Sequence, residues 1–272
     1  MSSLKIRLRD TLPAPLWDGL VSAKRAVVNE RLPEWTLGRR GRASRQRMRA
    51  FRDRHRGERC FIIGNGPSLK QTDLSLLRNE VTFGLNRIYL LFQELGFSTT
   101  YLVAVNKLVI EQCSQDLVQL PCPKFINWQS RDLIGFPPDL MFLRSRREPG
   151  FYTDITRGVW EGATVTYVAM QIAYYMGFQE VILIGVDHTF SATGKPHTTV
   201  VSEGDDPNHF APHYFGKGFR WQLPDLETSE LAYGLAKEQF ERSGREIVDA
   251  TIGGKLQVFR KVEYLELFKG RG

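Results

Sequence analysis

A short apolar run that leads into a glycine-rich turn is the feature of this sequence that most restricts its fold. Cys60–Ile63 is apolar and partly β-branched, which is typical of a strand buried on both faces of a sheet. The next five residues are Gly64, Asn65, Gly66, Pro67 and Ser68. The two glycines allow a sharp turn and the close approach of a ligand to the backbone, and the Pro-Ser pair suits the start of a helical turn.

A strand that runs into such a turn is where open α/β sheets bind phosphates. We therefore expect these five residues to bind a ligand, although a tight turn without a ligand explains the same spacing. The stretch is not a dinucleotide-binding fingerprint, because Leu69 stands where the third glycine is required. It is not a P-loop either, because no Gly-Lys-Ser/Thr sequence follows.

Strand-like and helix-like patterns alternate along the chain after Arg59. Apolar runs predict further strands at Val81–Leu85, Tyr101–Val105, Lys124–Ile126, Glu180–Ile184 and Glu246–Val248. Helical periodicity predicts helices at Ile88–Leu95, Lys107–Val118, Thr164–Met176 and Glu227–Ser243. This alternation predicts an α/β fold, a mostly parallel sheet with helices on both faces. Residues 129–160 follow neither pattern.

The residues before the first strand form a basic arm. The whole chain carries a net charge of +7, whereas residues 1–59 hold 16 basic and 6 acidic residues, so the rest of the chain is slightly acidic. We expect an arm over residues 1–57, partly helical, and a ligand-binding domain over residues 58–272. Within the arm, Leu16–Val28 fits a short amphipathic helix and Arg39–Arg56 is a run of arginines with few apolar residues.

A solvated helix that leads into the first strand is the simpler interpretation of the arm. Contact with an anionic membrane surface is the functional one. We prefer it to nucleic-acid binding because Trp17, Leu20 and Trp35 are types that favour membrane interfaces and no nucleic-acid-binding module is recognisable. The sequence shows neither a membrane-spanning stretch nor a signal-peptide pattern. We expect a cytoplasmic protein, peripheral at the inner face of the plasma membrane if the arm binds lipid.

Each of the first five predicted strands is followed by a small polar residue. These residues are Asn65, Asn86, Asn106, Asn127 and Asp187. The carboxyl ends of parallel strands share one edge of a sheet, where the ligand crevice lies, and asparagine side chains both donate and accept hydrogen bonds, which suits a nucleotide. Any single asparagine is explained as a helix cap, but the set favours a ligand site.

The start of the helix predicted at Thr164–Met176 is a second place for an anion. Gly162, Thr164 and Thr166 bring two hydroxyls and unpaired backbone N–H groups to a helix N-terminus. A threonine N-cap without a ligand explains the same residues.

A long polar loop leaves the fifth strand at Asp187. Four of the five histidines lie between His188 and His213, and loops of this length are often lids or binding loops. We expect acid–base work by one of these histidines in preference to metal binding, because a metal needs a tight ligand set and His209 and His213 with the nearby Asp205 and Asp206 only suggest one. No metal site is predicted.

Three stretches together resemble one superfamily: Gly64–Lys70, the strand that ends at Asn86, and Met176–Asp187. The superfamily joins the archaeal 6-hydroxymethylpterin diphosphokinase-like proteins, the motility-associated flagellin glycosyltransferases and the bacterial sialyltransferases that use CMP-activated sialic acid. The resemblance covers about residues 58–252. It implies a Rossmann-like sheet that binds a nucleotide or its sugar conjugate.

The resemblance also implies roles for single residues. Asn65 and Asn86 match sialyltransferase asparagines that hold the CMP donor, and Thr164–Thr166 lies where that family contacts the cytidine nucleotide. His209–His213 resembles the His-Tyr-x-Gly-His stretch whose second histidine is the general base, which makes His213 the base. A shifted register, in which the stretch begins at His213, leaves His209 as the alternative.

One departure from the sialyltransferase pattern concerns the donor. The paired tyrosines that assist the leaving phosphate in that family are absent just after Asp187, where His188 and Phe190 stand instead. We count His188 among the donor-binding residues, and Asp187 with His209 and His213 among the catalytic ones.

The leading hypothesis is a glycosyltransferase that moves a sugar, with a nonulosonic acid as one option, from a nucleotide-activated donor such as a CMP-sugar to a cell-surface glycan or lipid-linked acceptor. It requires no cofactor. The first alternative is a diphosphokinase acting on a 6-hydroxymethylpterin-like alcohol, which needs ATP and Mg²⁺ held by carboxylates such as Asp187, Asp205 and Asp206. The second is a non-catalytic nucleotide-binding protein whose loop histidines are structural.

Overall fold

The computed structural model describes residues 32–191 and 194–269, and the chain divides into two units, residues 1–44 and residues 45–272. The first unit contains helix α3 (Leu32–Leu37) and the start of helix α4 (Arg39–Arg49). The amphipathic helix predicted at Leu16–Val28 lies outside the described residues. None of the helices within the described ranges is long and apolar enough to cross a membrane.

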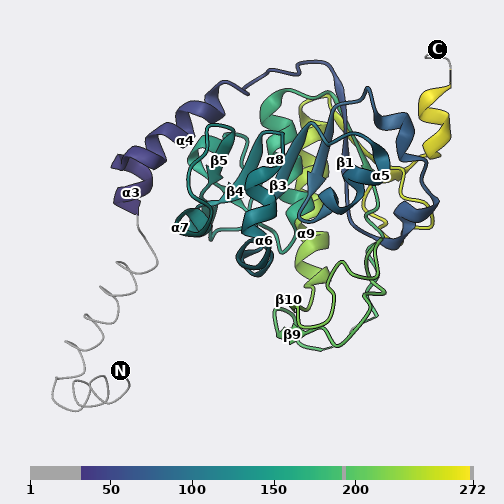
Figure 1. The fold of residues 1–272 in the computed structure, drawn as a ribbon. Helices are drawn as coiled ribbons and strands as arrows, with labels where there is room; N and C mark the ends of the chain where they lie inside the picture. The colour runs from purple at the N-terminus through teal and green to yellow at the C-terminus, as the bar shows by residue number, and fades with distance from the viewer. Residues whose placement is uncertain (1–31, 192–193, 270–272) are drawn as a thin grey trace, which may run out of the picture. The chain divides into compact units, whose positions relative to one another are not determined.

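The second unit is built on an eight-stranded sheet in the order β12-β11-β8-β1-β2-β3-β4-β5, in which every neighbouring pair is parallel (Figure 1). Its strands are β1 (Arg59–Ile63), β2 (Thr82–Leu85), β3 (Tyr101–Ala104), β4 (Lys124–Asn127), β5 (Leu140–Leu143), β8 (Glu180–Ile184), β11 (Glu246–Asp249) and β12 (Arg260–Lys261). The six strands expected from apolar runs are confirmed to within one residue at each end. Most of their residues are buried, as a sheet covered on both faces requires.

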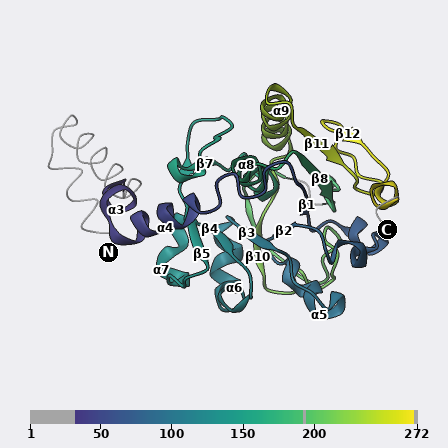
Figure 2. The same ribbon diagram turned by 90° about the horizontal axis from the view of Figure 1, so that it is seen from above.

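Helices cover both faces of this sheet, which confirms the expected α/β, Rossmann-like fold. Figure 2 shows α8 and α9 on one side of the sheet and α5, α6 and α7 on the other. Their bounds are α5 (Phe92–Leu95), α6 (Lys107–Gln119), α7 (Arg131–Ile134), α8 (Val165–Met176) and α9 (Leu226–Arg242). Short 3-10 helices follow several strands, at Pro67–Gln71, Leu74–Leu77, Ile88–Leu91, Trp128–Ser130, Ile155–Arg157 and Tyr264–Phe268.

Two small ribbons stand apart from the main sheet. Strands β6 (Ser145–Arg146) and β7 (Val159–Trp160) pair in parallel. Strands β9 (Thr199–Val201) and β10 (Arg220–Gln222) pair antiparallel and fold the long loop after β8 into a hairpin. These ribbons, β5 and β12 were not expected from the sequence.

Residues 45–57, which we assigned to the arm, pack within the second unit. The ring of Phe51 lies 5.6 Å from that of Phe125, and His55 stacks on Phe178 at 4.6 Å. The backbone N–H groups of Asp53 and His55 donate to carbonyls at the end of α8. This part of the arginine run therefore packs against the C-terminal end of α8 and donates hydrogen bonds to its last carbonyls.

Candidate functional site

The strand order places a topological switch point between β1 and β8. From β1 the chain adds β2, β3, β4 and β5 on one side, and then returns to place β8 on the other side of β1. The loops that leave β1 and β8 therefore diverge, and open α/β sheets bind ligands in the crevice that results. A cavity of about 660 Å³ lies at these strand ends, a size that suits a small-molecule ligand.

Most of the residues expected at the site line this cavity. They are Gly64, Asn65, Gly66, Asn86, Asn106, Gly162, Thr164, Thr166, Asp187, His188 and His209. Three expected residues do not line it: Pro67, Ser68 and His213.

Asp187 holds the glycine-rich turn in place. Its Oδ1 accepts from the backbone N–H of Ser68 at 3.0 Å and its Oδ2 from the Ser68 hydroxyl at 2.7 Å. A Cβ atom at Gly66 would overlap this carboxylate, and one at Gly64 would overlap the carbonyl of Gly185. Contacts within the protein therefore already require both glycines, and Asp187 is a positioning residue in this geometry.

The four asparagines at strand ends fall into two pairs. Asn106 caps α6, its Oδ1 accepting from the N–H of Leu108 at 2.9 Å, and Asn127 accepts from the N–H of Ser130 at 3.0 Å. In contrast, the Oδ1 atoms of Asn65 and Asn86 are buried and have no hydrogen-bond partner. Because a buried unpaired oxygen costs free energy, these two side chains are the ones that a bound ligand would satisfy.

Backbone strain is concentrated at the same place. Five described non-glycine residues have a positive φ, and four of them line the cavity: Asn86, Ala163, His188 and His197. Residues other than glycine rarely adopt this left-handed backbone conformation, and such strain is concentrated at functional sites.

The start of α8 forms one wall of the cavity. Thr164 caps the helix, its hydroxyl accepting from the N–H of Thr166 at 3.3 Å. The same hydroxyl lies 3.3 Å from that of Tyr233 on α9. Thr164 therefore fulfils the capping role. The backbone N–H groups of the first turn of α8 form a helix N-terminus, which favours an anion.

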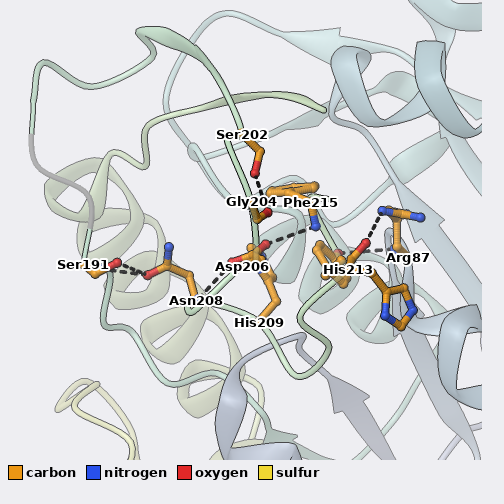
Figure 3. A network of polar contacts seen from close by, with 10 residues as sticks. Arg87, Ser191, Ser202, Gly204, Asp206, Asn208, His209, His213 and Phe215 are labelled. Carbon is orange, nitrogen blue, oxygen red and sulfur yellow. Dashed lines mark hydrogen bonds and ion pairs between the residues drawn. The ribbon is translucent and has the colours of Figure 1, made fainter. Parts of the chain in front are cut away.

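A histidine–carboxylate pair, His209 and Asp206, lies on the long loop after β8 (Figure 3), and His209 lines the cavity. The Nδ1 atom of His209 is 2.7 Å from Oδ2 of Asp206, and the side chains are 14% and 5% exposed. Asp206 also accepts from the N–H groups of Asn208 at 2.9 Å and Phe215 at 3.2 Å. The His209 ring stacks on Tyr214 at 4.0 Å, with 6° between the ring planes. An aspartate at Nδ1 fixes the tautomer, so Nε2 is left as a proton acceptor.

His213, four residues further along, has a different environment. Its side chain is exposed, and its backbone carbonyl accepts from Arg87 at 3.5 Å. Of the two registers that the sequence left open, only the one that selects His209 puts a histidine at the cavity.

Two more histidine–carboxylate pairs tie the loop to α9. His188 Nε2 lies 2.9 Å from Glu230 Oε1, and His197 Nε2 lies 3.1 Å from Asp225 Oδ2. Asp225 caps α9, and the backbone N–H of Thr228 is the main cause that lowers the pKa of the Asp225 carboxyl. Figure 1 shows the β9–β10 hairpin near one end of α9.

Comparison with known proteins identifies the family of this chain. The family model described as 6-hydroxymethylpterin diphosphokinase MptE-like matches residues 42–193, more than half of the chain. The chain belongs to the MptE-like family. No curated protein matches the sequence significantly.

Among solved structures, the MptE-like chain is similar to the MAf glycosyltransferase from Magnetospirillum magneticum AMB-1. The match has 13% sequence identity and a TM-score of 0.49, and it covers 90% of this chain and 42% of the other. The chain thus spans less than half the length of that glycosyltransferase. The family description names a transferase.

The carboxylates suggested for a metal in this MptE-like chain do not gather at one point. Asp187 is held by Ser68 at the main cavity, whereas Asp205 and Asp206 line a second, smaller cavity together with residues of the β9–β10 hairpin, and Asp206 is paired with His209. Across residues 32–191 and 194–269, no three His, Cys, Asp or Glu side chains are arranged to hold a metal ion. The residues present do not fit a preformed Mg²⁺ cluster.

The sequence interpretation missed several residues that line the cavity. They include Lys107, Ser145, Arg146, Trp160, Glu161, Phe215 and Trp221. Lys107 directly follows Asn106, and Glu161 precedes Gly162, so both were adjacent to expected residues. Ser145 and Trp160 belong to the β6–β7 ribbon, which no apolar or alternating pattern indicates.

Proposed function

We propose that the protein is a glycosyltransferase that moves a sugar from a nucleotide-activated donor to a hydroxyl of a glycan or lipid-linked acceptor. The observation that carries this proposal is His209, which is paired with Asp206 and lines the same cavity at the switch point as Asn65 and Asn86 with their unpaired oxygens. A positioned base beside a nucleotide-type crevice is the arrangement that such a transfer needs.

In the proposed reaction, Nε2 of His209 takes the proton of the acceptor hydroxyl as its oxygen attacks the anomeric carbon of the donor sugar. The bond between that carbon and the phosphate oxygen breaks, and the nucleotide leaves with the electron pair. Asp206 keeps the Nδ1 proton in place and stabilises the imidazolium that forms. The reaction releases the nucleotide and a glycosylated acceptor.

Positive groups around the cavity would stabilise the charge that develops on the leaving phosphate. Lys107 begins α6 and Arg146 lies on β6, and both line the cavity together with the first turn of α8. Fixed cations and helix N-termini favour a leaving phosphate without a metal ion.

The donor nucleotide is proposed to be CMP with a nonulosonic acid as the sugar, because of the residues that resemble the sialyltransferases. His188, which stands where one of the missing tyrosines would be, is held by Glu230 at the cavity wall. For the acceptor, the exposed arginines of α4 support work on lipid-linked glycans at the cytoplasmic face of the membrane.

A second function, diphosphoryl transfer to a pterin-like alcohol, is favoured by the family description. The same His209 could activate an alcohol in that reaction. It would require ATP with Mg²⁺, for which Asp187, Asp205 and Asp206 do not form a joint site. We therefore place it second. A non-catalytic nucleotide-binding protein is third, because it gives His209 no role in chemistry.

A thermal-shift panel of CMP, CDP, UDP, GDP, ADP and ATP, each with and without Mg²⁺, tests the proposal. Glycosyl transfer predicts stabilisation by CMP or another nucleotide without Mg²⁺. Stabilisation by ATP alone, and only with Mg²⁺, would support diphosphoryl transfer instead. The absence of any shift would contradict a nucleotide site.

A further inference from the structure

The cavity extends well beyond the switch point, to a corner at the β5 end of which the proposed chemistry uses only Arg146. Neighbouring strands lie about 4.8 Å apart, so the four spacings from β1 to β5 correspond to about 19 Å. At the β5 end, the β6–β7 ribbon carries Ser145, Arg146 and Trp160 into the cavity wall, and Glu161 follows β7 directly.

Glu161 is the acidic residue of this corner. The Ser145 hydroxyl donates to its Oε1, and the side chain is half-buried. Within the part of the chain that the structure describes, no Lys, Arg or His forms an ion pair with it, and the neighbouring Arg146 instead lies 3.7 Å from Glu148. Burial raises the pKa of the Glu161 carboxyl above its ordinary value of 4.5, and the hydrogen bond from Ser145 only partly opposes this. Burial therefore disfavours the ionised form of this carboxyl.

A strained turn fixes Glu161 in this position. The backbone N–H of Thr164 donates to the Glu161 carbonyl at 3.0 Å, and the two residues between them are left-handed, Gly162 at φ +54° and Ala163 at φ +58°. A side chain at Gly162 would overlap Ala232 and Tyr167. The turn therefore holds Glu161 rigidly against the first residues of α8.

Three acceptor groups of the cavity share one chemistry. Asn65 is 9% exposed, and its Oδ1, like that of Asn86, has no donor. Glu161 is also an acceptor when ionised. A phosphate offers no donor to any of the three at neutral pH, whereas hydroxyl and amino groups do.

We propose that Glu161 is a specificity-determining residue of this cavity, and that its carboxylate accepts hydrogen bonds from hydroxyl or amino groups of the bound ligand. This inference rests on the proposed function, in which a nucleotide conjugate occupies the cavity. The donors belong either to the nucleotide itself, in its base or ribose, or to the sugar attached to it.

Calorimetric titration distinguishes these two sources. The titrants are the nucleotide that stabilises the wild-type protein most in the panel above, once bare and once as its sugar conjugate, for example CMP and CMP-N-acetylneuraminic acid. Glu161→Gln keeps the size of the side chain but removes the charge that strengthens the hydrogen bond, so we expect its affinity for the contacted ligand to fall about tenfold or more. Ser145→Ala removes only the hydrogen bond that orients the carboxylate of Glu161, so it should cause a smaller loss of affinity.

A loss for the bare nucleotide as well as the conjugate would place the base or ribose at Glu161. A loss for the conjugate alone would place the sugar there. Unchanged affinity for both, in a Glu161→Gln protein that unfolds cooperatively and at no lower temperature than the wild type, would overturn the inference. Glu94→Gln makes the same substitution at an exposed residue of α5 and is the matched control. It should bind both titrants as the wild type does. If no nucleotide binds the wild-type protein, the proposed function is wrong. If the wild type binds and Glu161→Gln binds equally well, only the inference about Glu161 is wrong.

Discussion

The backbone N–H of Phe210 donates to the backbone carbonyl of Asn65 at 2.9 Å. This bond ties the long loop to the glycine-rich turn after β1. Because His209 immediately precedes Phe210, the general base that we propose is held next to the asparagine that has an unpaired oxygen. The bond therefore holds His209 close to the strand ends, although more than thirty residues separate β8 from α9.

Asn65→Ala should weaken nucleotide binding. Its Oδ1 has no partner in the protein, so removal of the side chain leaves the fold intact and deletes a hydrogen bond to the ligand, at a cost of about 1–3 kcal/mol. Calorimetry measures the affinity and thermal unfolding measures the fold. Unchanged affinity in a folded variant would remove this turn from the site.

Asn106→Ala should act on stability, in contrast to Asn65→Ala. Asn106 caps α6 through the N–H groups of Leu108 and Val109, and loss of such a cap costs about 1 kcal/mol of unfolding free energy. Denaturant unfolding measures this loss. An Asn106→Ala protein as stable as the wild type would show that the cap contributes nothing.

Glu161→Gln should change stability in a pH-dependent way. Burial raises the pKa of Glu161 in the folded protein, so the folded state favours the protonated form. The contribution of Glu161 to stability is therefore fully present below the ordinary pKa of 4.5 and is lost as pH rises through the folded-state pKa. Glutamine does not titrate, so we expect the variant to gain melting temperature relative to the wild type at pH 8 but not at pH 4. An equal difference at both pH values would contradict this.

Much of the sheet could be predicted from the sequence because parallel strands buried on both faces are continuous apolar runs, as in Cys60–Ile63 and Glu180–Ile184. β5 was missed because Leu140–Leu143 follows two prolines in a stretch with no regular pattern. The β6–β7 and β9–β10 ribbons have only two or three residues in each strand. Side-chain periodicity needs longer segments to be visible.

The site was predictable as a set of strand ends but not in the role of each residue. Asn65 and Asn106 have the same sequence setting, a small polar residue after a strand, and yet one is unpaired and the other caps a helix. That difference depends on the direction of each side chain in the folded chain. Likewise, the sequence spacing of His209 and His213 cannot show that Asp206 pairs with the first of them.

The exposed arginines of α4 should contribute to binding of anionic vesicles. Each basic side chain near such a surface contributes about 1 kcal/mol, so replacement of Arg39, Arg42 and Arg49 by Gln should weaken co-sedimentation about 100-fold at low salt. Salt should weaken wild-type binding too, because it screens the attraction. Deletion of residues 1–57 is unsuitable, because Phe51 and His55 pack in the second unit.

A control for this experiment removes the same charge elsewhere. It replaces three exposed basic residues far along the chain, Arg242, Arg260 and Lys269, by Gln. Equal loss of vesicle binding in both triple variants would mean that total charge, and not α4, drives the attraction. Wild-type protein that ignores anionic vesicles at low salt would refute the membrane role.

Chelation of divalent metals separates the two enzymatic proposals. We expect EDTA to leave most transfer activity in place, because cations and helix termini of the chain can stabilise a leaving phosphate. Loss of all activity in EDTA, restored by Mg²⁺, would favour diphosphoryl transfer. Asp187→Asn is a poor substitute for this test, because it also disturbs the hydrogen bonds to Ser68 that shape the glycine-rich turn.

The central claim is that His209, and not His213, is the general base. The direct measurement is turnover, followed as nucleotide release from the donor identified by the panel, in His209→Ala and His213→Ala proteins whose donor affinity is measured in parallel. We predict that His209→Ala lowers turnover about 100-fold or more with little change in donor affinity, since a base acts mainly in the transition state, whereas His213→Ala stays close to the wild type. Full turnover in His209→Ala, or an equal loss in His213→Ala, would contradict the account.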